Sequence, residues 1–165
     1  MLMPRWTRIL PGCVLGVVCW LGVFQATSRA QTAGDVAVVV HADVAVDNLT
    51  LADLRRVTLG DREFWPGSAR ITLLVRAPIA HERDVVLKTI CQMTEAQFRQ
   101  HWIAKVFRAD TAVAPKIVYS NEMAVDLVNR IPGAIAFVDA SQMSSRLKVV
   151  RIDGRLPGEK GYPLR

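Results

Sequence analysis

Two hydrophobic patterns alternate along the chain from about residue 35 onward. Short runs that are apolar on both faces are typical of strands buried inside a sheet, whereas apolar residues three and four apart are typical of helices. The predicted strands are 35–41, 71–75, 116–119, 134–138 and 147–152. The predicted helices are 51–59, 80–91, 94–107 and 120–130. This alternation predicts one α/β domain with helices flanking a mostly parallel sheet, and with strand 35–41 in the sheet interior.

Several helix ends are marked by capping residues. Thr94 and Gln97 fit the pattern of a capping box, and Ser120 is a second candidate N-cap. Gly60 follows the first helix at the position where a left-handed glycine commonly ends one. The tail 153–165 is rich in proline and glycine and is predicted to be a surface loop.

The N-terminus has the organisation of a cleavable secretory signal peptide. Arg5 and Arg8 precede an apolar run of about sixteen residues, which is shorter than the ~20 needed to span a bilayer as a helix. Small residues at Ser28 and Ala30 stand where a signal peptidase cleaves. The sequence therefore predicts export.

Cleavage would define the mature chain. We expect residues 1–30 to be removed, which leaves a single periplasmic domain, 31–165, with its core over 36–152 and no membrane span. An uncleaved N-terminal anchor is the alternative. Lipid attachment at Cys13 is not expected, because this cysteine stands at the start of the apolar run instead of after it.

Charge and cysteine content narrow the function classes. The whole chain has a formal net charge of +6, and loss of the three signal-peptide arginines lowers it to about +3. This mild excess suits an anionic ligand, but no basic stripe interleaved with aromatic residues predicts nucleic acid as a partner. Cys91 is the one mature cysteine, which excludes a disulfide framework; it is interpreted as a buried apolar residue, with a reactive thiol as the alternative. Four aromatic residues are expected to anchor the core: Trp65, Phe98, Trp102 and Phe107.

The sequence contains no recognisable motif for catalysis or metal binding. His41, His81 and His101 do not stand at metal-ligand spacing, and neither a nucleophile elbow nor a phosphate-binding glycine loop with lysine occurs. We therefore expect a protein without enzymatic activity, cofactor or metal.

Two arginines form a candidate anion site. In parallel sheets, ligands bind at the carboxyl ends of strands, where helix N-termini present N–H groups, so the loops after His41, Val75 and Tyr119 are of interest. Arg76 ends the second strand and Arg83 lies in the first turns of the next helix. Two guanidinium groups aimed at one point would hold a phosphate or carboxylate. The alternative is that both are solvated, or that Arg83 pairs with an acid brought close by the fold.

Several segments, taken in order, carry a family resemblance. They are LADLR leading to LG (51–60), FWPG (64–67), ITLLVR (71–76), the aromatic positions of 98–107 followed by Pro115, and IPGAIAFV (131–138). Together they resemble the substrate-binding proteins of phosphate ABC importers, especially their short, single-lobe relatives. The resemblance covers about residues 36–152 and implies a single lobe of a periplasmic-binding-protein type II fold.

The resemblance also implies which residues hold an anion. Arg76 is similar to the arginine that precedes a Ser-Gly-Thr helix start in the full-length members, and Ala80 and His81 stand in the region of those glycine and hydroxyl residues. Arg83 is similar in place to a basic residue of the short relatives, and Ser120 begins the helix after the third strand. Two departures stand out: the hydroxyl groups are missing here, and the chain is too short to supply a second lobe.

Two functions follow from the resemblance. The first is an exported, non-catalytic solute-binding protein for phosphate or another small oxyanion, working with an ABC importer permease or another periplasmic protein. The alternative is a periplasmic protein-interaction or adaptor module that kept the lobe and lost the ligand. The adaptor hypothesis predicts an exposed apolar surface, and a homodimer is compatible with both.

Overall fold

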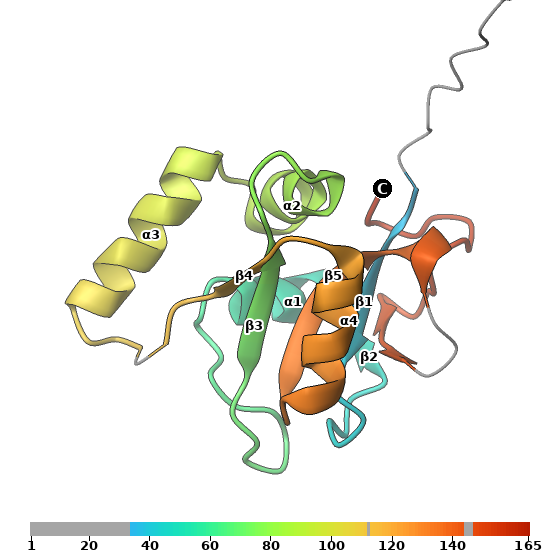
Figure 1. Cartoon of the computed structure of the whole chain (residues 1–165), viewed down its shortest axis with the longest axis horizontal. Helices are drawn as coiled ribbons and strands as arrows, with labels where there is room; N and C mark the ends of the chain where they lie inside the picture. The colour runs from blue at the N-terminus through green and yellow to red at the C-terminus, as the bar shows by residue number, and fades with distance from the viewer. Residues whose placement is uncertain (1–33, 112, 144–146) are drawn as a thin grey trace, which may run out of the picture. The chain divides into compact units, whose positions relative to one another are not determined.

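The computed structural model describes residues 34–111, 113–143 and 147–165 (Figure 1). The predicted signal peptide lies outside the described residues. The strands are β1 (Val36–Val40), β2 (Asn48–Leu49), β3 (Thr72–Arg76), β4 (Lys116–Val118), β5 (Ala134–Asp139), β6 (Lys148–Val149) and β7 (Arg151–Ile152). The helices are α1 (Leu51–Thr58), α2 (His81–Val85), the π-helix η1 (Val86–Cys91), α3 (Glu95–Phe107), α4 (Asn121–Arg130) and the 3₁₀-helix η2 (Ala140–Gln142). None of the helices in these ranges is both long and apolar enough to cross a membrane.

The main sheet is mixed. Its strand order is β4-β3-β5-β1-β6, with β3 parallel to β4 and β5, and β1 antiparallel to β5 and β6. The predicted α/β fold is confirmed, and β1 lies inside the sheet as expected. Its direction was predicted wrongly, because burial on both faces shows that a strand is interior but does not specify which way it runs. As a consequence, His41 lies at the opposite edge from Arg76.

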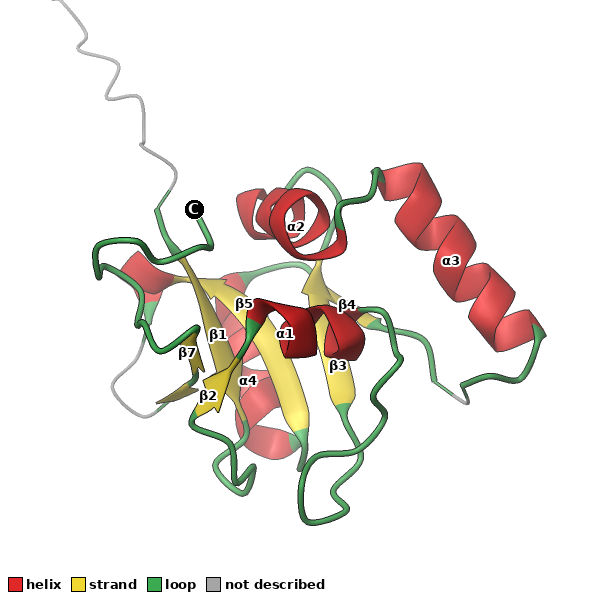
Figure 2. Cartoon of the chain, turned by 180° about the vertical axis from the view of Figure 1, so that it is seen from behind, coloured by secondary structure: helices red, strands yellow, loops and turns green. Residues whose placement is uncertain are grey.

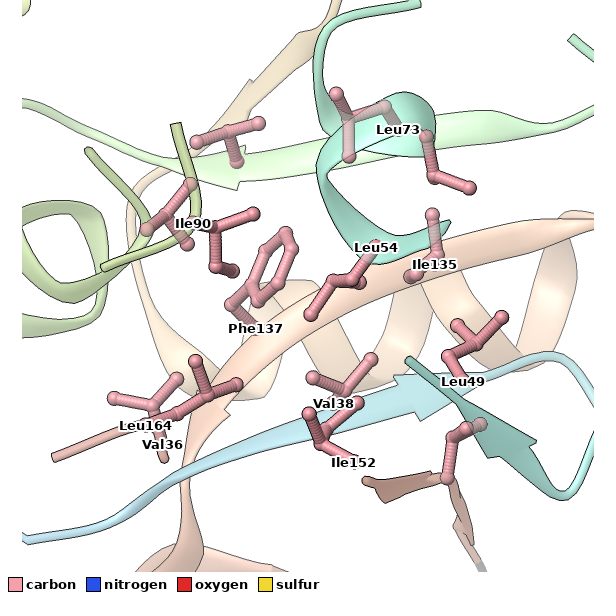
Figure 3. Packing of buried hydrophobic residues seen from close by; sticks show 14 of the residues in the cluster. Val36, Val38, Leu49, Leu54, Leu73, Ile90, Ile135, Phe137, Ile152 and Leu164 are labelled. Carbon is pink, nitrogen blue, oxygen red and sulfur yellow. The ribbon is translucent and has the colours of Figure 1, made fainter. Parts of the chain in front are cut away.

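Helices cover both faces of the sheet. Figure 1 shows α4 on one face, and Figure 2, turned by 180°, shows α1 on the other. On the α1 face, Leu54 and Ile90 pack with Val38 and Phe137 of the central strands, as Figure 3 shows. On the α4 face, a second cluster of smaller side chains joins Leu74 to the helix. The sheet is thus buried between two apolar layers, which fits its valine-rich strands.

The predicted caps are present. Thr94 accepts a hydrogen bond from the Gln97 backbone N–H, and the Gln97 side chain accepts one from the Thr94 backbone, which completes the capping box. Gly60 has φ 71° and follows the C-cap of α1, as predicted. These local signals were readable because each satisfies backbone groups only a few residues away.

Three predictions about the periphery need correction. The tail is not merely a surface loop, because Tyr162 and Leu164 are buried and both hydrogen-bond the backbone of Val36. The predicted strand 147–152 is divided, and its second half, β7, pairs with β2 in a separate two-stranded sheet. Phe107 is 89% exposed and is not a core anchor.

Candidate functional site

Most of the candidate anion-binding residues gather at one edge of the sheet. Because β3 and β4 are parallel neighbours, their carboxyl ends meet at the same edge. Arg76 ends β3, and Ala80 is the N-cap of α2. Ser120, two residues beyond β4, is the N-cap of α4. The structure therefore brings these residues to the edge where the sequence placed an anion site.

Arg76 keeps unused donors at this edge. It follows Leu74 by two residues and so shares the α4 face of the sheet. Its side chain is only 13% exposed, and its Nε lies 3.4 Å from Oε2 of Glu82. This ion pair lacks hydrogen-bond geometry: within the described ranges, the buried Nε and Nη1 of Arg76 have no hydrogen-bond partner. Buried charged donors without acceptors are costly, and a bound anion is one way to satisfy them.

Arg83 is occupied by the protein itself. Its Nε and Nη2 donate to the two carboxylate oxygens of Glu95, at 3.0 and 2.8 Å. Its Nη1 donates to the Arg76 carbonyl at 3.4 Å, and the guanidinium lies 4.8 Å from the centre of the Phe98 ring. The alternative that Arg83 pairs with an acid brought close by the fold is confirmed. Three of the five N–H donors of Arg83 are therefore engaged within the protein, and Glu95 neutralises its charge.

The remaining candidates offer little to an anion. Ala80 caps α2 without a side-chain hydrogen bond. His81 contacts the Gly34 carbonyl through Nε2, at 3.1 Å, and so ties the start of α2 to the segment leading into β1. Ser120 accepts a hydrogen bond from the Met123 backbone N–H at 3.1 Å, which is an N-cap role.

Glu122 already places a carboxylate at the start of α4. Its own backbone N–H, the Ser120 hydroxyl and the charge of Arg76 hold the pKa of this carboxyl below its usual value. A negative charge here is favoured by the helix dipole, in the same way as a bound anion. With Glu82 and Glu95, it is one of three glutamates at the site that the sequence reasoning missed. An acidic residue in the first turn of a capped helix was the available signal for Glu122.

The loop between β3 and α2 has a strained residue. Ile79 has φ 79°, a left-handed conformation that a β-branched side chain rarely adopts, and its side chain is fully exposed. Tyr119, in the neighbouring loop after β4, is also exposed. The carboxyl edge of the sheet thus carries two exposed side chains, of Ile79 and Tyr119, beside the buried Arg76.

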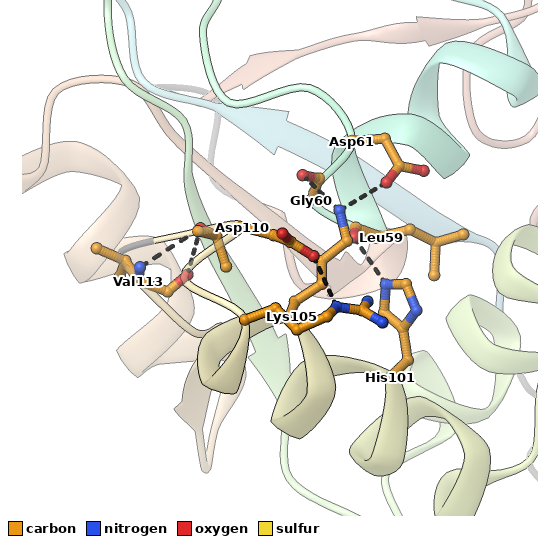
Figure 4. Close-up of polar contacts among 9 residues, drawn as sticks. Leu59, Gly60, Asp61, His101, Lys105, Asp110 and Val113 are labelled. Atoms are coloured by element: carbon orange, nitrogen blue, oxygen red, sulfur yellow. Dashed lines mark hydrogen bonds and ion pairs between the residues drawn. The ribbon is translucent and has the colours of Figure 1, made fainter.

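Helix α3 is anchored along one side to the end of α1. His101 contacts the Leu59 carbonyl through Nε2 at 2.9 Å, and Lys105 donates to the Gly60 carbonyl and to Asp61 at 3.1 and 2.7 Å (Figure 4). A cation at the C-terminal end of a helix also complements the helix dipole. The Trp102 ring packs so closely that a Cβ on Gly60 would lie 2.6 Å from it.

The other side of α3 borders an apolar groove of about 500 Å³. We define the α3 groove by its lining residues: Pro78, Arg83, Glu95, Phe98, Arg99, Trp102, Ile103, Val106, Phe107, Ala114, Pro115 and Ile117. Nine large apolar side chains are exposed among the described residues, and four of them line this groove: Ile103, Val106, Phe107 and Ile117. Such a concentration of exposed apolar surface is typical of an interaction site. Sequence reasoning missed the groove by assigning Phe107 to the core.

The reactive-thiol alternative for Cys91 finds no support. Cys91 is fully buried, and burial raises the pKa of its thiol to about 12, which confirms its interpretation as a buried apolar residue. Within the ranges that the structure describes, no three His, Cys, Asp or Glu side chains come together as a metal site.

Comparison with known proteins gives a fold likeness. No model of a protein family matches the sequence, and no curated protein matches it. Among solved structures, an ABC-type phosphate transport receptor from Vibrio cholerae matches with a TM-score of 0.60 and 19% identity, over 75% of this chain and 49% of the receptor. PstS from Borrelia burgdorferi matches with a TM-score of 0.63 and 15% identity, over 79% of this chain and 54% of PstS.

A third similar structure contains phosphate. It is described as a phosphate ABC transporter substrate-binding protein from Clostridium perfringens with bound phosphate, and it matches with a TM-score of 0.59 and 18% identity, over 73% of this chain and 46% of that protein. The chain spans about half the length of these solved structures. The fold is therefore that of one lobe of a phosphate-transporter substrate-binding protein, and the predicted resemblance is confirmed at the level of fold.

Proposed function

We propose that this chain is an exported, non-catalytic protein that binds a small oxyanion such as phosphate at the carboxyl edge of its sheet. The observation that carries the proposal is the pair of buried Arg76 nitrogens, Nε and Nη1, without hydrogen-bond partners. A small oxyanion can accept a charge-assisted hydrogen bond from a guanidinium N–H that has no other partner. The likeness of fold to a solved protein with bound phosphate supports an oxyanion as the ligand.

The surrounding charges predict weak binding. Glu82 already offsets part of the Arg76 charge, and Glu122 occupies the start of α4 with its own carboxylate. The charge of Arg83 is neutralised by Glu95, which engages two of its N–H donors, so it adds little attraction for an anion. We therefore expect a dissociation constant of about 1 mM, which corresponds to about 4 kcal/mol of binding free energy.

Calorimetric titration of the purified protein with inorganic phosphate tests the proposal. Arg76→Gln combined with Glu82→Gln removes the donors without leaving an unpaired buried charge, and should abolish the binding heat while the circular dichroism stays unchanged. Arg99→Gln removes an arginine on α3, outside the site, and should bind phosphate as the parent does. Equal phosphate binding by the parent and the double variant would remove Arg76 from the site.

Export is a separate part of the proposal. The basic start, the apolar run and the small residues Ser28 and Ala30 support cleavage after residue 30. Expressed from its full reading frame in a Gram-negative host, the protein should appear in the periplasmic fraction with Gln31 as its first residue. Mass spectrometry of the intact chain measures this. A chain that retains residues 1–30 and sediments with membranes would support the anchor alternative.

A second candidate function is a periplasmic protein-interaction module. The α3 groove supports it, because this hypothesis predicts an exposed apolar surface and four exposed large apolar side chains line the groove. An importer permease, another periplasmic protein or a second copy of the chain are its candidate partners. The two functions use different residues, so one chain can perform both.

A further inference from the structure

We propose that the α3 groove binds an apolar peptide segment of another protein, and that this segment carries an acidic residue that pairs with Arg99. The inference rests on the second candidate function and names the chemistry of its partner. The apolar part of the groove lining requires a partner segment with apolar side chains. Ile103, Val106 and Ile117 are each about half exposed, and Phe107 is almost fully exposed, so a partner that covers them removes apolar surface from water.

The charged residues of the groove lining require an acidic residue on the partner segment. Arg83, Glu95 and Arg99 are its charged lining residues. Arg83 and Glu95 neutralise each other through two hydrogen bonds. No acid in the described ranges lies within ion-pair distance of Arg99, so the lining carries one uncompensated positive charge. An acidic side chain on the partner complements this charge, whereas a basic one is repelled by it.

The neighbouring cations do not extend this charge into a basic patch. Lys105 pairs with Asp61 at 2.7 Å, and Arg108 pairs with Asp110 at 3.0 Å. A membrane surface or a nucleic acid is recognised by several clustered cations, whereas the groove lining carries a single unpaired one. The groove therefore fits a mostly apolar peptide with one or two acidic residues.

A second copy of the chain fits this surface less well. In a two-fold symmetric dimer, each patch meets the same patch of its partner. The uncompensated Arg99 of one copy would then share the interface with the same positive charge of the other. The observations thus favour an acidic segment from a different protein.

Selection from a library of random twelve-residue peptides, displayed on phage and captured by the immobilised protein, tests the inference. Enriched peptides should contain at least two large apolar residues, and Asp or Glu more often than Lys or Arg. The best peptide is then synthesised with a fluorescent label, together with a version in which Lys replaces its acidic residues. Fluorescence anisotropy should show about tenfold weaker binding of the Lys version.

Three variants identify the surface. Val106→Asp places a charge in the apolar lining and should weaken binding of the acidic peptide by at least about tenfold. Arg99→Glu should reverse the preference, so that the Lys version binds more tightly than the acidic one. Arg56→Glu makes the same charge change at an exposed position of α1, outside the lining, and should leave both affinities unchanged.

The outcomes separate the claim that the α3 groove binds a peptide from the claim that this peptide carries an acidic residue. Peptides that bind and are lost in Val106→Asp, but whose affinity does not respond to Arg99→Glu, overturn the acidic partner and keep the interaction function. A screen with no enrichment, together with a monomeric protein in light scattering, overturns both. A dimer in light scattering that Val106→Asp dissociates assigns the groove to a second copy and overturns the inference. Calorimetric titration of these variants with phosphate tests the anion site at Arg76 separately, because none of the substitutions lies at that site.

Discussion

Helices α4 and α3 begin with the same device but bury their apolar residues differently. Both are N-capped by a hydroxyl, from Ser120 and Thr94 respectively. In α4, Ala124 and Val128 are fully buried against the sheet. In α3, Phe98 is buried near the start, while Phe107 at the end is almost fully exposed.

The difference comes from the number of apolar stripes on each helix. Helix α4 has one stripe, of which Ala124 and Val128 are buried and Met123, in the first turn, is 40% exposed. Helix α3 has a first stripe, Phe98 and Trp102, four residues apart, and a second, Ile103, Val106 and Phe107, with spacing of three and four. The first stripe packs on the core, and the second lines the α3 groove. A helix with more apolar surface than its own core can cover thus indicates an interaction site.

The largest expected effect separates the two stripes of α3. Phe98→Ala removes a buried ring that packs against Trp102 and Arg83, and should lower the free energy of unfolding by about 3–5 kcal/mol. Phe107→Ala makes the same chemical change at an exposed position and should change it by less than about 0.5 kcal/mol. Urea denaturation followed by circular dichroism measures both. Equal costs for the two variants would contradict the division of α3 into a buried and an exposed side.

A second pair of substitutions tests the attachment of α3 to α1. Gly60→Ala adds a Cβ only 2.6 Å from the Trp102 ring and also strains a residue with positive φ, so it should cost about 2–4 kcal/mol. Gly67→Ala has a similar positive φ but no atom within 4 Å of the new Cβ, so it should cost about 1–2 kcal/mol. The difference between the two unfolding free energies measures the clash with Trp102. A difference near zero would mean that α3 moves away from α1 without cost.

Capping substitutions sharpen the comparison between the two helices. Ser120→Ala and Thr94→Ala each remove one N-cap hydrogen bond and should each cost about 1 kcal/mol. Because α4 is buried on the sheet, the loss of Ser120 should appear as a lower stability of the whole domain. Because α3 is exposed on one side, the loss of Thr94 should appear mainly as faster amide hydrogen exchange in 95–98. Identical exchange patterns in the two variants would argue against this difference.

The smallest expected effect concerns pH. The pKa of Glu122 is lower in the folded protein than its ordinary value of 4.5, so its contribution to stability is present above that value and is lost as the pH falls through the lowered pKa. Glu122→Gln should therefore flatten the decline in stability below about pH 4.5. Asp126→Asn changes the same charge on the same helix, one turn further along, as a control. The melting temperature between pH 3 and pH 7 measures the effect.

The same substitution has a second readout at the proposed anion site. Removing the Glu122 charge beside Arg76 takes away repulsion of an incoming anion, so phosphate should bind about threefold more tightly. An affinity that falls instead would mean that the carboxylate does not compete with the ligand.

The fold was largely predictable because its signals are local. Strands such as Ala134–Asp139 and Thr72–Arg76 were located to within one residue, since burial on both faces leaves a short unbroken apolar run. Strand direction was not predictable for β1, because the pairing of Val36 with Asp139 depends on residues a hundred positions apart. The burial of Leu164 was hidden for the same reason, within a segment whose composition is that of a loop.

The candidate site was only partly predictable. The position of Arg76 at a strand end follows from the strand pattern, and the structure places it at the predicted edge. The Arg83–Glu95 pair joins two helices across a break at Gln92, where the backbone is left-handed. No spacing rule within one helix reaches across such a break. The surroundings of Arg83 therefore required the tertiary structure.

The contacts of the C-terminal tail have a consequence for the order in which the protein can fold. Strand β1 precedes α1 in the chain, whereas its neighbour β5 and the tail residues that bond Val36 follow α4. A growing chain therefore cannot pair β1 with β5 until α1 to α4 have been made, nor form the tail contacts to Val36 until residue 164 has left the ribosome. Such late, long-range closure slows folding. It also keeps the polypeptide extended for longer, which is the state that the proposed export through a secretory channel requires.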